Sequence, residues 1–131
     1  MRAVYLDSSA FVKLIVEETE SAALRTFLAG SKGRRVSSAL IRTESLRAVR
    51  QLGPEALATV REGLRRLDVI GIDDRILDAA GILEAQVLRS LDAIHMATAL
   101  AVGDDLEVIV TYDERMVKAA RLMGLATATP R

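Results

Sequence analysis

Short runs of aliphatic and β-branched residues alternate along this chain with longer segments whose apolar residues recur at helical spacing. The clearest strand pattern covers residues 107–111, and weaker patterns cover residues 3–6, 35–37, 69–72 and 126–129. Helical patterns lie between them, and Gly103 and Gly124 mark two of the helix ends. Because strands separated by helices favour parallel pairing, the sequence predicts an α/β fold, with helices on both faces of a parallel sheet.

The length and composition are those of one compact domain. The chain has 131 residues, half of them hydrophobic, with no internal repeat and no Pro- or Ser-rich linker. Charges interrupt every apolar stretch before it reaches membrane-spanning length, and residues 1–16 carry Asp7 and Lys13 where a signal peptide would be apolar. We therefore expect a single domain over residues 1–131, located in the cytoplasm and without a membrane partner.

The charge balance does not decide whether the chain binds nucleic acid. Eighteen basic residues balance eighteen acidic ones, so the basic excess of a typical nucleic-acid binder is missing. Fifteen of the basic residues are arginines, which bind phosphate well, but a genome that favours arginine codons explains the same ratio. The composition neither supports nor excludes an RNA substrate.

Two aspartates follow predicted strands directly. In open parallel sheets, ligands bind at the carboxyl ends of the strands, where the strand order switches. Asp7 follows the first strand, and Asp113 follows Thr111 and Tyr112 at the end of the strand at 107–111. Both are expected at the same edge of the sheet. Taken alone, each is better explained as a turn residue or a helix cap.

Two further acids lie in predicted helices. Glu44 falls on a largely apolar face of the helix after the second strand, where an acid is costly unless it is paired or bound to a metal. Asp92 lies in the first turn of a later helix. Taken alone, pairing with Arg47 explains Glu44, and the helix dipole explains Asp92. The hypothesis of a shared site depends on all four acids reaching one edge.

Four carboxylates in one cleft would repel one another, and a divalent hard cation relieves that repulsion. Mg²⁺ or Mn²⁺ prefers oxygen ligands, whereas the absence of cysteine and the single histidine disfavour zinc. One or two such ions would activate water for attack on a phosphodiester. Asp7, Glu44, Asp92 and Asp113 are therefore the predicted catalytic and metal-binding residues. His95 is interpreted as a hydrogen-bonded residue beside the site rather than as a general base.

The segments around these acids resemble the motifs of PIN-domain nucleases. Leu-Asp-Ser-Ser-Ala at 6–10, with Val-Lys-Leu at 12–14, resembles the opening motif, and residues 91–99 and 110–115 resemble the third and fourth acidic motifs. Glu44 falls where the second acid is expected. The resemblance covers essentially the whole chain, and its small size and Lys13 look most like the VapC-type toxins of toxin–antitoxin pairs.

This resemblance implies a three-layer α/β/α sandwich around a parallel sheet of four or five strands. It also implies that Asp7, Glu44, Asp92 and Asp113 hold Mg²⁺ or Mn²⁺. Ser8 or Ser9, together with Thr111, would support the carboxylates by hydrogen bonds. The implied activity is endonucleolytic cleavage of RNA. The implied partners are a second copy of the chain, as a homodimer, and an antitoxin peptide that occupies the active-site groove.

Several alternatives stay open. Within the family, one alternative is an RNA-processing nuclease without an antitoxin. Another is a non-catalytic module that binds RNA or protein, and the presence of all four acids disfavours this second alternative. A haloacid-dehalogenase-type phosphatase would need an aspartate where Ser9 stands, and neither the pattern of a receiver domain nor a Gly-rich phosphate loop is present. Candidate RNA contacts, which solvated helix faces explain equally well, are Arg42, Arg47, Arg50 and Arg89.

Overall fold

The computed structural model describes residues 2–131; Met1, the first residue of the predicted domain, lies outside the described residues. Its centre is a five-stranded sheet in the order β3-β2-β1-β4-β5, in which all neighbouring strands are parallel. The strands are β1 (Ala3–Leu6), β2 (Arg34–Ser38), β3 (Asp68–Ile70), β4 (Leu106–Val110) and β5 (Thr127–Ala128). The predicted α/β fold with a parallel sheet is confirmed.

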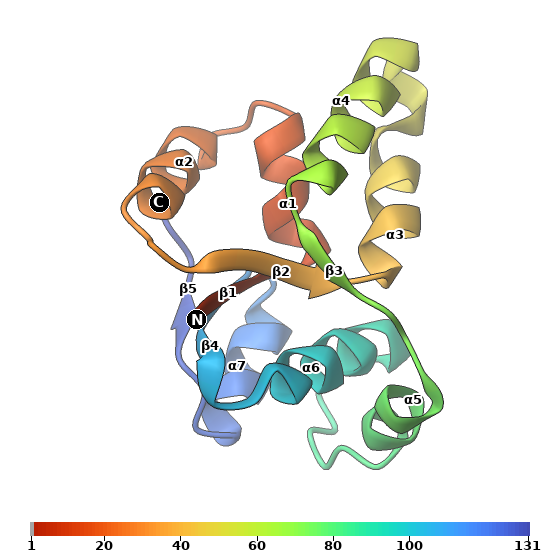
Figure 1. Cartoon of the computed structure of the whole chain (residues 1–131), viewed down its shortest axis with the longest axis vertical. Helices are drawn as coiled ribbons and strands as arrows, with labels where there is room; N and C mark the ends of the chain where they lie inside the picture. Colours follow the sequence, from red (N-terminus) through yellow and green to blue (C-terminus); the bar gives the residue numbers. More distant parts are fainter. Residues whose placement is uncertain (1) are drawn as a thin grey trace.

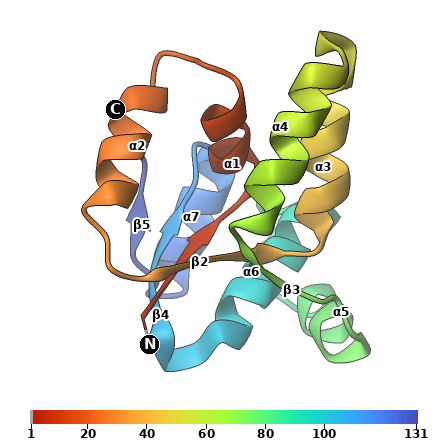
Figure 2. The ribbon, with the colours of Figure 1, turned by 45° about the horizontal axis from the view of Figure 1, so that its top comes forward.

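Helices cover both faces of the sheet, with α1 to α4 on one face and α5 to α7 on the other (Figures 1 and 2). Their bounds are α1 (Ser8–Ile15), α2 (Ser21–Ala29), α3 (Leu40–Val49), α4 (Pro54–Arg65), α5 (Asp74–Gly81), α6 (Ser90–Val102) and α7 (Glu114–Leu122). Among residues 2–131, no helix combines the length and the apolar character needed to cross a membrane.

The central strand β1 is buried on both faces, as expected for the middle of a parallel sheet. Because successive side chains of a strand alternate, Val4 and Leu6 pack into the core beneath α1 to α4, whereas Ala3 and Tyr5 pack into the core beneath α6 and α7. The β1 strand thus joins two hydrophobic cores. It also presents the Tyr5 side chain to α6.

With Ser38 as a possible N-cap and Gly53-Pro54 as a stop, the sequence predicts a helix that runs to Leu52, and the observed helix differs at both ends. Ser38 is the last residue of β2, and its hydroxyl accepts a hydrogen bond from the Leu40 backbone N–H at 3.1 Å. The predicted contact therefore forms from one position before the N-cap. The α3 helix ends at Val49 and continues as a 3-10 turn, Arg50–Leu52. Gly53 then adopts a positive φ of 99°, which glycine tolerates without strain.

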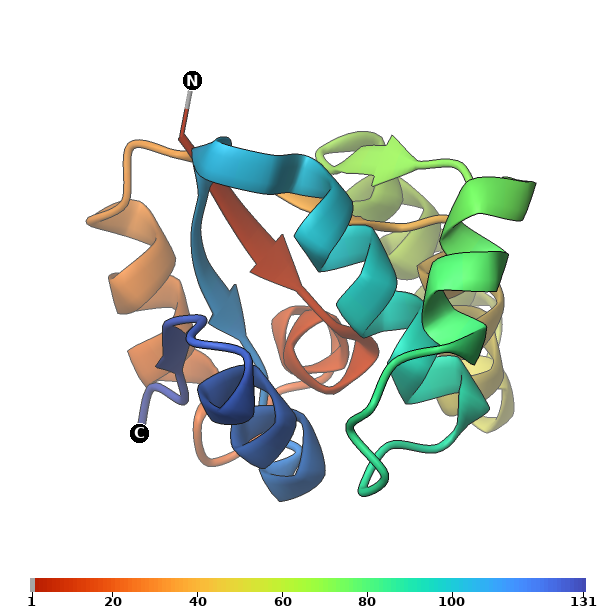
Figure 3. The ribbon, with the colours of Figure 1, turned by 90° about the horizontal axis from the view of Figure 1, so that it is seen from below.

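The strand order switches at β1. The chain adds β2 and β3 on one side of β1 and then returns to its other side for β4 and β5. In such sheets the crevice outside the carboxyl ends of the strands at the switch point is the usual ligand site. Figure 3 views the molecule from the α5–α7 side, where α6 and α7 pack against β1 and β4.

The packing beneath α2 gives a test of the fold. Leu24 is fully buried in the core under α1 to α4, whereas Leu122 on α7 is 72% exposed. Replacing Leu24 by alanine should lower the free energy of unfolding by about 2–5 kcal/mol, because the change removes buried apolar contacts and leaves a cavity. Leu122→Ala, the matched control, should change it by less than about 0.5 kcal/mol. Chemical denaturation measures both, and equal effects would contradict the assignment of the core.

Candidate active site

Asp7 is the most buried of the four predicted acids. It follows β1 as the N-cap of α1, where its carboxylate accepts a hydrogen bond from the Ala10 backbone N–H at 3.1 Å. The hydroxyl of Ser9 donates to the same oxygen at 2.6 Å, and the hydroxyl of Thr111 donates to the other oxygen. With 4% of its surface exposed, this carboxylate is held by three donors in one orientation.

These donors also join β4 to the start of α1. The Tyr112 backbone N–H donates to the Ser9 hydroxyl at 2.9 Å, and the Asp113 backbone N–H donates to the Thr111 hydroxyl at 3.1 Å. Each hydroxyl therefore accepts from the backbone after β4 while it donates to Asp7. The predicted supporting roles of Thr111 and of one serine match this geometry, and the serine is Ser9.

Asp113 caps the next helix. It is the N-cap of α7, and its carboxylate accepts from the Arg115 backbone N–H at 2.9 Å. The Nε atom of Arg115 lies 3.5 Å from the same carboxylate oxygen and partly balances its charge. Asp7 and Asp113 are thus both helix caps, as the simpler interpretation of each proposed, and both lie at the carboxyl ends of the two strands at the switch point.

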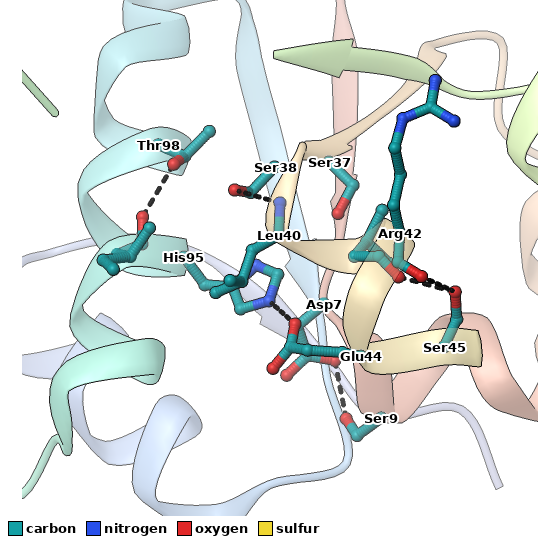
Figure 4. A network of polar contacts seen from close by, with 12 residues as sticks. Asp7, Ser9, Ser37, Ser38, Leu40, Arg42, Glu44, Ser45, His95 and Thr98 are labelled. Atoms are coloured by element: carbon teal, nitrogen blue, oxygen red, sulfur yellow. Dashed lines mark hydrogen bonds and ion pairs between the residues drawn. The ribbon is translucent and has the colours of Figure 1, made fainter. Parts of the chain in front are cut away.

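Glu44 points from α3 toward α6. Its carboxylate oxygen lies 2.6 Å from Nε2 of His95, and Figure 4 shows the two side chains meeting beside Asp7. The Nδ1 atom of His95 lies 2.7 Å from the hydroxyl of Tyr5 on β1. His95 is 2% exposed. The partner of Glu44 is therefore a histidine from across the site, and His95 is the buried, hydrogen-bonded residue that the sequence indicated.

Asp92 completes the group from the first turn of α6. Burial raises the pKa of its carboxyl above the ordinary value, and the negative charges of Asp113 and Glu44 raise it further; the positive charge of Arg115 acts in the opposite direction. Because charges interact this strongly only over short range, Asp92, Asp113 and Glu44 share one electrostatic environment. Asp113 and Glu44 therefore both lie within electrostatic range of Asp92.

Burial also raises the pKa of Asp7, while the hydrogen bonds from Ser9, Thr111 and Ala10 lower it. Figure 4 shows the Asp7 side chain beside the Glu44–His95 pair, so the three side chains share one part of the site. All four acids therefore lie at the carboxyl edge of the sheet. The structure brings them there from four elements: β1, α3, α6 and the segment after β4.

The acids are not yet in one coordination sphere. Among the described residues 2–131, no group of three or more Asp, Glu, His or Cys side chains is close enough to hold a metal ion as it stands. The chemistry of the group nevertheless fits a hard divalent cation, because it offers carboxylate oxygens whose mutual repulsion raises the pKa of Asp92. The metal-binding role of these residues stays a prediction.

Two other features lie apart from the acids. Arg42, a candidate RNA contact, extends away from Glu44 on the far side of α3 (Figure 4). A groove of about 330 Å³ between α1 and α4, with Phe11, Leu14 and Gly63 in its lining, includes none of the four acids. Tyr5 was not among the predicted site residues, because its only sequence signal is a polar hydroxyl within an otherwise apolar central strand.

Ribonucleases of one bacterial species are similar to this chain over nearly its whole length. Ribonuclease VapC46 of Mycobacterium tuberculosis is 50% identical over 130 residues, which cover 99% of each chain. Ribonuclease VapC35 of the same species is 44% identical and covers 97% of this chain and 96% of its own.

Solved structures share the fold. The crystal structure of M. tuberculosis VapC20, described as a sarcin–ricin loop cleaving toxin, aligns with a TM-score of 0.78 at 15% identity, covering 97% of this chain and 99% of that one. DNA-bound VapBC from Salmonella typhimurium aligns with a TM-score of 0.73 at 24% identity, covering 98% of both chains. The sequence model of the PIN domain matches residues 4–122, and the chain belongs to the PIN domain family, among its VapC ribonucleases.

Proposed function

We propose that this chain is a metal-dependent endoribonuclease and the toxin of a toxin–antitoxin pair. The observation that carries the proposal is the gathering of Asp7, Glu44, Asp92 and Asp113 at the carboxyl edge of the sheet, in a chain of the VapC family. A fold needs no such concentration of negative charge, because like charges held together destabilise it. A site that binds a cation and a phosphodiester does need it.

The same four carboxylates would hold Mg²⁺ or Mn²⁺. When bound, such an ion polarises water and the scissile phosphate and neutralises the charge that develops on the leaving oxygen. The chain's own contribution is orientation. Ser9 and Thr111 fix the Asp7 carboxylate, and the α7 N-terminus fixes Asp113. Helix α6 carries Asp92 in its first turn. Acids that are fixed in this way need little reorganisation when cation and substrate arrive.

The partners follow from the same assignment. The RNA substrate is supported by the ribonuclease relatives, and an antitoxin protein is supported by structural neighbours that are toxin–antitoxin complexes, including one from Klebsiella pneumoniae. A homodimer and a cytoplasmic location are proposed from the family resemblance. Among the candidate RNA contacts, Arg47 lies on the helix of Glu44, and Arg89 precedes α6, the helix of Asp92.

The first test is RNA cleavage by charge-neutralised variants. Asp7→Asn and Asp92→Asn keep the size of each side chain and remove its negative charge. Each should lower the rate of RNA cleavage at saturating Mg²⁺ by at least about 100-fold, because the cation and the phosphate lose a ligand that orients them. Cleavage of total cellular RNA, followed on denaturing gels with and without Mg²⁺ or Mn²⁺, measures this.

Asp74→Asn is the matched control, because Asp74 is an exposed residue in the first turn of α5 and takes no part in the site. It should cut RNA at the rate of the unaltered chain. If Asp7→Asn and Asp92→Asn also cut at that rate, the four acids are structural and the proposed function is wrong. Cleavage that does not depend on a divalent cation would contradict the proposed metal requirement.

The second test is the pH dependence of cation binding. The pKa of Asp7 is raised by burial, and that of Asp92 is raised by burial and by Asp113. Both carboxylates therefore hold protons at a pH where exposed aspartates have lost theirs, and a cation must displace these protons. Mn²⁺ affinity should rise with pH, by up to about tenfold per pH unit for each proton displaced, and level off above the raised pKa values.

Isothermal titration calorimetry between about pH 5 and pH 8 measures this dependence. The Asp92→Asn variant should bind Mn²⁺ more weakly and with a shallower pH dependence, since one of the titrating ligands is gone. Affinity that is independent of pH over this range would contradict the proposal that Asp7 and Asp92 are the ligands.

A further inference from the structure

Tyr5, His95 and Glu44 form a continuous chain of hydrogen-bonding groups. The Tyr5 hydroxyl lies 2.7 Å from Nδ1 of His95, and Nε2 of His95 lies 2.6 Å from the Glu44 carboxylate. Tyr5 and His95 are almost completely buried, and their rings meet edge to face with centroids 5.9 Å apart. Only Glu44, whose side chain is 20% exposed, reaches the surface of the site.

The direction of each hydrogen bond follows from the groups involved. A carboxylate only accepts, so Nε2 of His95 donates its hydrogen to Glu44. The tyrosine hydroxyl can then donate to Nδ1, which accepts. The His95 ring therefore carries its hydrogen on Nε2.

We propose that Tyr5 and His95 are positioning residues, which hold the Glu44 carboxylate at the site so that it serves as a ligand there. This inference rests on the proposed function. Glu44 has three side-chain torsions and lies on a helix that faces solvent on one side, so an unrestrained carboxylate would turn toward water, away from the negative charge of Asp92. The hydrogen bond from a buried, immobile ring opposes that movement.

The hydrogen bonds that join Tyr5, His95 and Glu44 also fix the acid-bearing elements relative to one another. Tyr5 lies on β1, which ends at Asp7; His95 lies one helical turn beyond Asp92 on α6; and Glu44 is itself an acid of the site. One run of two hydrogen bonds thus links three of the four elements that carry the acids. The link between Thr111 and Asp7 attaches the fourth.

Two substitutions of His95 separate positioning from packing. A glutamine nitrogen lies as many bonds from Cα as Nε2 of histidine, so His95→Gln can still donate to Glu44. The amide of His95→Asn reaches only the position of Nδ1 and can contact Tyr5 but not Glu44. Both variants remove the same buried ring, and thermal unfolding of each shows how much stability that loss costs.

We expect His95→Asn to lower Mn²⁺ affinity and kcat for RNA cleavage by about 10- to 100-fold, the usual effect of losing a residue that orients a metal ligand. His95→Gln should restore most of both at a similar melting temperature. Tyr5→Phe should produce a smaller loss in the same direction. Tyr112→Phe is its matched control, because it removes the only other tyrosine hydroxyl, which donates to the Pro130 carbonyl, and it should leave Mn²⁺ affinity unchanged.

Nuclear magnetic resonance gives an independent readout, because His95 is the only histidine of the chain. Its ring nitrogens should report a hydrogen on Nε2 and an accepting Nδ1, and Tyr5→Phe should shift the Nδ1 resonance. A hydrogen on Nδ1 would overturn the donors and acceptors assigned to the hydrogen bonds of His95.

Three binding outcomes decide the inference. If both His95 variants bind Mn²⁺ as tightly as the unaltered chain, Glu44 needs no positioning and the inference is wrong. If both lose affinity equally, in proportion to lost stability, the ring has a packing role only, and the inference is also wrong. If the unaltered chain neither binds Mn²⁺ nor cuts RNA, the proposed function itself fails and the positioning role fails with it.

Discussion

The burial of a charged carboxylate at the end of the central strand is the constraint on which this structure depends. Asp7 lies where β1 meets α1, almost without solvent, and burial alone would favour its neutral form. Three donors offset that cost: the Ala10 backbone N–H and the hydroxyls of Ser9 and Thr111. Since Thr111 comes from the neighbouring strand, β1 and β4 must stay in register for Asp7 to remain satisfied, and that register in turn places Asp113.

The remaining acids are held in a different way. Asp92 and Asp113 lie at helix N-termini, where the helix dipole favours negative charge, and Arg115 balances part of it. Glu44 lies within α3 rather than in its first turn, and its carboxylate is held by His95. The site therefore keeps four carboxylates together by local compensation at each one, while the repulsion between Asp92, Asp113 and Glu44 remains. That residual repulsion is what a divalent cation would remove.

Much of this arrangement could be predicted from the sequence, because it is local. The strands, the capping positions of Asp7 and Asp113 and the place of Asp92 in a first helical turn follow from residues within a few positions of one another. The partners of Glu44 and Tyr5 do not: His95 is 51 residues from Glu44 and 90 from Tyr5, and their contact depends on how α3 and α6 pack around the sheet. The interpretation of Glu44 as the i+3 partner of Arg47 failed for that reason. The link from Thr111 to Asp7, across 104 residues, could be expected only from the resemblance to PIN-domain nucleases.

The most direct test of the account is a crystal structure of the chain with Mn²⁺, in which anomalous scattering locates the ion. The account predicts a peak at the carboxyl edge of the sheet, coordinated directly by Asp7 and by at least one of Asp92 and Asp113, with Glu44 still bonded to His95. A peak elsewhere, or carboxylates that keep their metal-free positions at saturating Mn²⁺ with no ion between them, would contradict the claim that these acids form a metal-dependent active site.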